Sequence, residues 1–162
     1  MARKVFFSFH YTRDSHRVAQ IRNCNAVSQH FERTPFLDRA QWESIKRQGV
    51  AAIQKWINDN MNGTSVVVLC FGLETYKRPW VIYELEKAHR EGRGIVAIDM
   101  SGMNNMLNQY DGPGPNPLVY AKDALGNRLS SHAKYITYHW GRDNGRLYID
   151  NWIEKAAQLA GR

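Results

Sequence analysis

The feature that most constrains the fold is a short apolar run followed by an amphipathic helix. Val66 to Phe71 are all apolar, which is typical of a strand buried on both faces of a sheet. Pro79 suits the first turn of a helix, where its missing N–H costs nothing. Val81, Leu85 and Ala88 then recur on one helical face. Together they predict a strand–helix unit of the kind that builds parallel α/β sheets.

A second face of this helix carries a possible site. Trp80, Glu84 and Lys87 share it, at spacings of four and three residues. The carboxylate therefore lies one turn from a large aromatic side chain, on a helix that begins near the carboxyl end of a buried strand. Because open α/β sheets bind ligands outside that end, Glu84 becomes the centre of the candidate site.

The rest of the chain alternates in the same way. Apolar patterns predict further strands over 5–9, 34–38, 95–100 and 134–140, and further helices over about 18–31, 46–60 and 149–159. This order predicts an α/β fold in three layers, with a flavodoxin-like, doubly wound and mostly parallel five-stranded sheet. Its switch point falls between the first and third strands. Pro35 cannot donate to a ladder, so its strand is expected at a sheet edge.

The sequence also predicts the loops that connect these elements and the extent of the domain. Residues 10–15 are expected to form a loop with Asp14 or Ser15 as the N-cap of the first helix. Residues 39–43 are expected to form another loop, with Ser44 as a cap. With 162 residues, the chain is expected to be a single domain spanning 1–162. Between about 101 and 126 the periodicity fails, and so long a loop is usually functional or mobile.

Charge and cysteine content indicate which binding partners and which cellular compartment to expect. The formal net charge is +7, but the basic residues are scattered, which favours general attraction for anions over nucleic-acid binding. Two cysteines, Cys24 and Cys70, are too few for a disulfide framework, so a reducing, cytoplasmic location is expected. No apolar run approaches the roughly 20 residues that span a bilayer, and no membrane partner is expected.

The chain lacks the sequence motifs that are typical of several kinds of functional site. The six histidines and two cysteines show no metal-ligand spacing, so no metal site is expected. The chain has no Gly-x-Ser-x-Gly elbow and no Gly-x-Gly-x-x-Gly after the first strand. The end of the first strand also lacks the acidic residues of a phospho-receiver.

What remains is one carboxylate beside aromatic residues in an anion-friendly cleft. This combination suits cleavage at a glycosidic carbon through an oxocarbenium-like state, which a carboxylate stabilises. Trp80, Phe9 or Tyr11 would stack on a departing flat base, and Arg78 or Lys77 would hold phosphates.

Spacing alone leaves a plainer interpretation open. Glu84 would then be a partly exposed glutamate paired with Lys87, and Trp80 would be a core residue.

The motifs nonetheless resemble a known family. Val5-Phe-Phe-Ser-Phe-His10, Thr64-Ser-Val66 and Trp80-x-x-x-Glu84-Leu85 resemble the TIR domain. Thr75-x-x-Arg78-x-Trp80-Val81-x-Tyr83-Glu84 and Gly114-Pro-Asn-Pro117 are similar to the TIR proteins of the bacterial Thoeris anti-phage system. The similarity is good from Lys4 to about Asp99 and weak beyond Leu118. Many TIR domains have serine and cysteine where this chain has Arg78 and Val81.

This resemblance implies an activity and its partners. Glu84 would be the catalytic residue that cleaves the nicotinamide–ribose bond of NAD, with no cofactor beyond NAD as substrate. The product would be a signal nucleotide, a cyclised ADP-ribose or a related conjugate, which a separate effector protein senses.

The resemblance also implies the surroundings of Glu84. Ser8, Phe9 and His10 would line the nicotinamide-ribose side, with Arg78 and Trp80 also in the pocket. Asp38 and Trp42 would lie in the loop after the second strand, which in TIR domains borders the pocket and drives assembly, so a homo-oligomer is possible.

Two other classes of function stay open. In a non-catalytic interaction module, Glu84 would be dispensable and exposed residues near Trp42 would matter. A nucleoside deoxyribosyltransferase is also flavodoxin-like and uses a glutamate nucleophile, but it would exchange bases on deoxynucleosides and ignore NAD.

Overall fold

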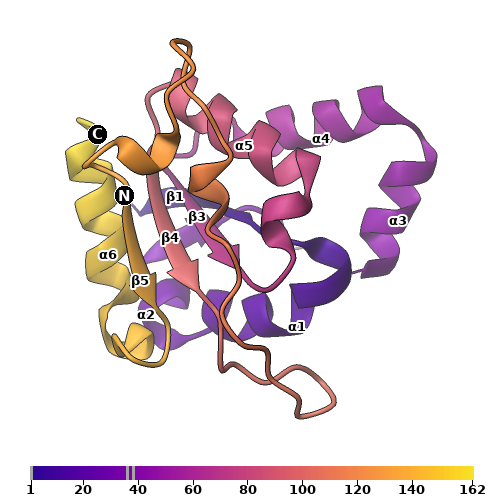
Figure 1. Ribbon diagram of the computed structural model, residues 1–162, viewed down its shortest axis with the longest axis vertical. Helices are drawn as coiled ribbons and strands as arrows, with labels where there is room; N and C mark the ends of the chain where they lie inside the picture. The colour runs from indigo at the N-terminus through magenta and orange to yellow at the C-terminus, as the bar shows by residue number, and fades with distance from the viewer. Residues whose placement is uncertain (1, 36, 38) are drawn as a thin grey trace.

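The computed structural model describes residues 2–35, 37 and 39–162, and its sheet has the predicted architecture. Five parallel strands follow the order β2-β1-β3-β4-β5 (Figure 1). The strands are β1 (Arg3–Ser8), β2 (Phe31–Arg33), β3 (Val66–Phe71), β4 (Gly94–Asp99) and β5 (Ile136–His139). The α-helices are α1 (Tyr11–Arg22), α2 (Asn25–Ser28), α3 (Arg39–Arg47), α4 (Val50–Met61), α5 (Pro79–Arg90) and α6 (Gly145–Leu159), and the short 3₁₀ helices are η1 (Thr75–Lys77), η2 (Pro117–Val119) and η3 (Leu129–Ser131).

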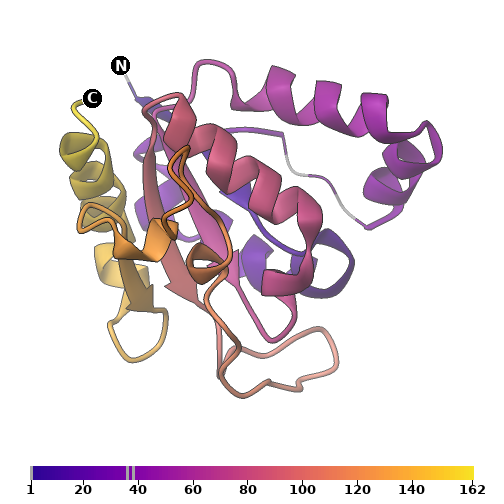
Figure 2. The same cartoon turned by 45° about the horizontal axis from the view of Figure 1, so that its top comes forward.

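The sheet is covered on both faces, which confirms the doubly wound α/β class. α4 and α5 pack on one face, while α6 and α2, with α1 beside them, lie on the other (Figures 1 and 2). Every residue of β3 is buried, as expected for the strand at the centre of a two-sided parallel sheet. No helix in the described part of the chain is both long and apolar enough to cross a bilayer.

The first helix begins earlier than predicted. α1 starts at Tyr11, and His10 is its N-cap, so the expected loop over 10–15 is wrong. The carbonyl of His10 accepts the backbone N–H groups of Arg13 and Asp14. Asp14 does not cap the helix, because its buried carboxylate pairs with Arg17 one turn later, at 2.8 Å. The helix therefore brings Tyr11 directly against the end of β1.

The region after β2 also differs from the expectation. Residues 39–47 form α3 rather than a loop, and Gly49 with a φ of +101° separates α3 from α4. Glycine is favoured at such a backbone angle, so the single predicted helix is divided at this point. Figure 2 shows α3 set away from the sheet, where its main contacts are with α1 and α4.

The edge position of the second strand was predicted correctly, but its residues were not. β2 pairs with β1 over Phe31–Arg33, and the backbone N–H of Thr34 still donates to Val5. The predicted strand over 34–38 is therefore displaced toward the N-terminus. Phe36 and Asp38, within that predicted strand, lie outside the described residues.

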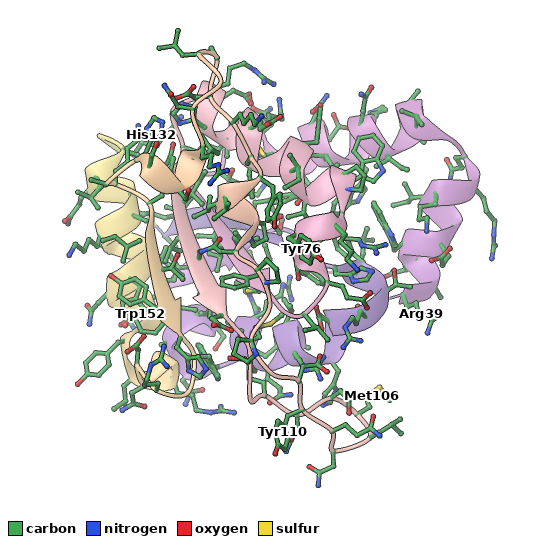
Figure 3. All side chains as sticks on the ribbon, in the orientation of Figure 1. Arg39, Tyr76, Met106, Tyr110, His132 and Trp152 are labelled. Carbon is green, nitrogen blue, oxygen red and sulfur yellow. The ribbon has the colours of Figure 1, made fainter. Side chains whose placement is uncertain are left out.

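The long segment after β4 is held in place by one buried arginine. Arg17 of α1 donates through Nε to the carbonyl of Met103 at 3.0 Å, and through Nη2 to that of Gln109 at 3.3 Å. Its Nη1 lies 3.3 Å from a carboxylate oxygen of Asp111. The tip of this segment projects from the molecule with Met106 and Tyr110 on its surface (Figure 3). Although this segment lacks the periodicity of a helix or strand, Arg17 anchors the part of it that lies against α1.

Candidate active site

Glu84 lies where the topology favours a ligand site. β1 and β3 are adjacent in the sheet, and the connections from their carboxyl ends lead to opposite faces, which makes this the switch point. α5 begins at Pro79 and places Glu84 on its second turn. The carboxylate thereby comes against the last residue of β1, Ser8.

The carboxyl group of Glu84 is completely buried. Its Oε2 accepts a short hydrogen bond from the Ser8 hydroxyl, while Oε1 has no hydrogen-bond partner among the described residues. Burial raises the pKa of Glu84 to about 8, and the Ser8 hydrogen bond opposes part of that rise. A buried, incompletely satisfied carboxyl group is a typical feature of functional sites rather than of stable cores.

The interpretation of Glu84 as an exposed partner of Lys87 is therefore wrong. Lys87 instead pairs with Glu91, at 2.8 Å, one turn further along the helix.

A cavity of about 100 Å³ adjoins Glu84. Its lining comes from the end of β1, the start of α1, α3 and the start of α5: Phe9, His10, Tyr11, Thr12, Trp42, Lys46, Arg78, Pro79, Trp80, Val81 and Glu84. Ser8 is not part of this lining but donates a hydrogen bond to the Glu84 carboxyl group. The structure thus brings together Ser8, Phe9, His10, Trp42, Arg78 and Trp80 around Glu84, whereas Asp38 lies outside the described residues. The functional role of each one stays a prediction.

Aromatic rings form one wall of this cavity. The Tyr11 ring lies 4.2 Å from that of Phe9 and stacks on that of Trp42, at 4.7 Å between centroids and 22° between planes. Trp42 is only 6% exposed, although its helix lies away from the sheet. The stack therefore fastens α3 to the end of β1 and gives the cavity a flat apolar surface.

Polar side chains also line the cavity. Nε of Arg78 and Nδ1 of His10 are both buried without a hydrogen-bond partner among the described residues. Burial, and then the nearby charge of Arg78, lower the pKa of His10 to about 4, so the imidazole is neutral at pH 7. A neutral donor or acceptor and a fixed cation are thus available beside the carboxyl group.

Two details of the site differ from the sequence interpretation. Lys77 is exposed and lies over the ring of Tyr76, at 5.6 Å from its centroid, instead of lining the cavity. Lys46 does line it and was missed, because residues 39–43 were expected to form a loop. Its spacing of four residues from Trp42 would have placed both on one helical face had α3 been recognised.

These features define the class of protein as a parallel α/β domain with a cavity at the switch point of its sheet. A buried carboxyl group from the helix after the third strand lies against that cavity. A family model described as "Thoeris protein ThsB, TIR-like domain" matches residues 6–105. The chain belongs to this family of ThsB-like TIR proteins. The matched region begins within β1, extends beyond β4 and includes the whole cavity lining.

The similarity to a curated relative extends further. The chain is 33% identical over 162 residues to "Putative cyclic ADP-D-ribose synthase ThsB1" of Bacillus cereus (strain MSX-D12). The alignment covers 99% of this chain and 82% of the relative. It therefore includes the segment beyond residue 118, where the motifs quoted above are sparse.

Proposed function

We propose that this protein cleaves the nicotinamide–ribose bond of NAD and releases a cyclic ADP-ribose-type nucleotide that a separate effector protein detects. The observation that carries the proposal is the completely buried Glu84, with one carboxylate oxygen unpaired beside a cavity. The name of the Bacillus cereus relative supports the same chemistry. We place the reaction in the cytosol, in keeping with two buried free cysteines.

The proposed reaction begins with the departure of nicotinamide. The bond between the ribose C1′ and the pyridinium nitrogen breaks, and its electron pair neutralises the ring. The positive charge passes to the sugar as an oxocarbenium-like centre. Ionised Glu84 stabilises that charge, and its environment of low polarity strengthens the attraction. Because the substrate ring is itself cationic, its binding also favours the ionised carboxylate.

The cavity lining has a separate proposed role in binding. The flat surface formed by Phe9, Tyr11 and Trp42 suits the nicotinamide ring, and Trp80 adds a further aromatic side chain near Glu84. Arg78 and Lys46 supply positive charge for the diphosphate, which lies outside the small cavity in this arrangement.

The second step determines the product. A hydroxyl group or an adenine nitrogen of the same molecule attacks C1′, forming the new glycosidic bond. An attacking hydroxyl group loses its proton, which Glu84 is placed to accept. Water would give linear ADP-ribose instead. The apolar aromatic wall excludes water from this position, which favours the intramolecular attack.

The decisive experiment compares NAD cleavage by the parent, Glu84→Gln and Glu86→Gln. Glu86 is on the same helix but outside the cavity, so Glu86→Gln is the matched control. Nicotinamide release is followed by chromatography and the nucleotide product by mass spectrometry. We expect Glu84→Gln to lower the rate at least about 100-fold, as for loss of an electrostatic stabiliser, and Glu86→Gln to retain it. Protein from phage-challenged cells is assayed in parallel, to supply any infection-dependent trigger.

Other outcomes correspond to the remaining hypotheses. Equal NAD cleavage by Glu84→Gln and the parent would remove Glu84 from the chemistry. Retained defence in cells by Glu84→Gln, together with loss in Trp42→Ala, would support an interaction module. Base exchange on deoxynucleosides without NAD cleavage would identify a deoxyribosyltransferase.

A further inference from the structure

Three potential metal ligands converge on the other side of α5, away from the NAD-binding cavity. A ring nitrogen of His89, a ring nitrogen of His132 and a carboxylate oxygen of Asp123 all lie within 4.8 Å of one another. His89 belongs to the last turn of α5, whereas the other two come from the segment between η2 and β5. The fold therefore brings together residues whose sequence spacing does not suggest a metal site.

Backbone hydrogen bonds fix Asp123, and a short helix precedes His132. Oδ1 of Asp123 accepts the backbone N–H groups of Leu125 and Asn127, which leaves Oδ2 to contact Nε2 of His132 at 2.9 Å. His132 follows η3, which is anchored by the completely buried Leu129. The ring of His132 lies 4.7 Å from that of His89, in a T-shaped arrangement. The three potential ligands thus lie on well-defined local structure, with His89 on α5 and the other two in the segment before β5.

A fourth polar group completes the cluster. The Tyr135 hydroxyl lies 2.5 Å from Nδ1 of His89. Such a hydrogen bond fixes the orientation and tautomer of an imidazole, which is the usual role of the outer shell around a metal-binding histidine. An open groove of about 470 Å³ borders His89 and Asp123, so an ion would have a path from solvent.

We propose that His89, Asp123 and His132 bind one divalent transition-metal ion of the zinc class, which ties the 120–135 segment to α5. Two imidazoles and one carboxylate suit Zn²⁺ and also accept Co²⁺ or Ni²⁺. Tetrahedral ligands about 2.0–2.1 Å from zinc are separated by roughly 3.3 Å. The side chains therefore need to approach by at most about 1.5 Å, which partly exposed groups achieve by small rotations.

The charges around the cluster are compatible with this occupant. Lys122 and Arg90 line the groove as cations, and Glu86 on the same groove supplies an opposing negative charge. Because these two cations oppose the approach of a metal ion, binding depends on direct coordination by His89, Asp123 and His132.

This metal site is independent of the proposed NAD chemistry. His89 follows Glu84 by five residues, which is about 7.5 Å along the helix and about 140° around it. Failure of either proposal would therefore leave the other unaffected.

The test uses the full chain without an affinity tag, after dialysis against a chelator, with zinc chloride as the probe in titration calorimetry. We expect one equivalent to bind, and both His132→Asn and His89→Gln to weaken binding at least about 100-fold. Tyr135→Phe should weaken it about 10-fold, as for loss of an outer-shell partner. His30→Asn changes an exposed histidine elsewhere and should bind like the parent.

Two further measurements keep the test independent of folding defects in a variant. Cobalt(II) should give visible ligand-field absorption in the parent and none in His132→Asn. Zinc at about 100 times its dissociation constant should raise the melting temperature of the parent by about 5–10 °C and leave that of His132→Asn unchanged. Absence of stoichiometric binding, or binding that survives both histidine substitutions, would overturn the proposal and leave only a hydrogen-bonded cluster.

Discussion

At the scale of single residues, the proposed chemistry depends on a carboxyl group that the fold keeps protonated near neutral pH. Glu84 has its pKa raised to about 8 chiefly because it is buried, and Ser8 is its hydrogen-bond donor. The group is ready to ionise when a cationic ring binds, since that ring supplies the missing countercharge. Two predictions follow from this single titration.

The first concerns catalysis. If ionised Glu84 is required, kcat/KM for NAD should rise with pH through an apparent pKa near 8 for the free enzyme. Ser8→Ala removes the hydrogen bond that favours the charged form, so the acid limb should move to higher pH by about one unit. Rates of nicotinamide release between pH 6 and pH 10 measure this. Ser28→Ala, at an exposed position in α2 outside the cavity lining, serves as the control, and an identical limb in Ser8→Ala would contradict the assignment.

The second concerns stability. The pKa of Glu84 is higher in the folded than in the unfolded chain, so the folded protein binds more protons, and its stability falls as pH rises from about 4.5 to about 8. Glu84→Gln lacks this titration. From pH 5 to pH 8 the parent should lose about 3 kcal/mol relative to the variant. Urea midpoints for both proteins across this range test the prediction, and parallel pH profiles would exclude a raised pKa in the folded state.

At the scale of elements, the segment after β4 is positioned by close backbone contact as well as by Arg17. A Cβ atom on Gly114 would lie 2.3 Å from the carbonyl oxygen of Gly72 and 2.7 Å from Cα of Leu73. Only glycine allows the segment to approach the exit of β3 so closely. The Gly114-Pro-Asn-Pro117 motif therefore has a physical role in packing the connection against the switch point.

A matched pair of substitutions tests this contact. Gly114→Ala forces two backbones apart and should lower the free energy of unfolding by about 1–3 kcal/mol. Gly112→Ala, two residues earlier, meets no atom within 4 Å and should change it by no more than about 1 kcal/mol. Urea unfolding of the two variants gives the comparison directly. Equal effects at both positions would show that the close approach to Gly72 is not maintained in solution.

At the scale of the whole molecule, the net charge of +7 provides a field that attracts an anionic dinucleotide. Between about 0.01 M and 0.1 M salt, the Debye length falls from about 30 Å to about 10 Å. The KM for NAD should therefore rise several-fold over this range, while kcat should change little because the proposed site of bond cleavage is the cavity beside Glu84. Sucrose at matched osmolality is the uncharged control. A KM that does not respond to salt would assign substrate capture to local contacts alone.

The order of the elements followed from the sequence, but several of their boundaries did not. Sequence periodicity reflects which side of a strand or helix is buried. It identified β3, which is buried on both sides, and α5, which has one apolar face. The first turn of α1 and most of α3 were missed. Trp42 of α3 is buried by stacking on Tyr11 of another helix, so its position depends on a tertiary partner. Local propensity carries no information about such partners.

The sequence by itself determined the parallel α/β class and the position of Glu84 near the carboxyl end of β3, because alternating buried strands and amphipathic helices admit few arrangements. Only the tertiary structure decided that this carboxyl group is buried, bonded to Ser8 and open to a cavity on one oxygen. It also brought His89 toward Asp123 and His132. Burial and convergence depend on contacts between residues far apart in the chain, and these exist only once the layers have packed.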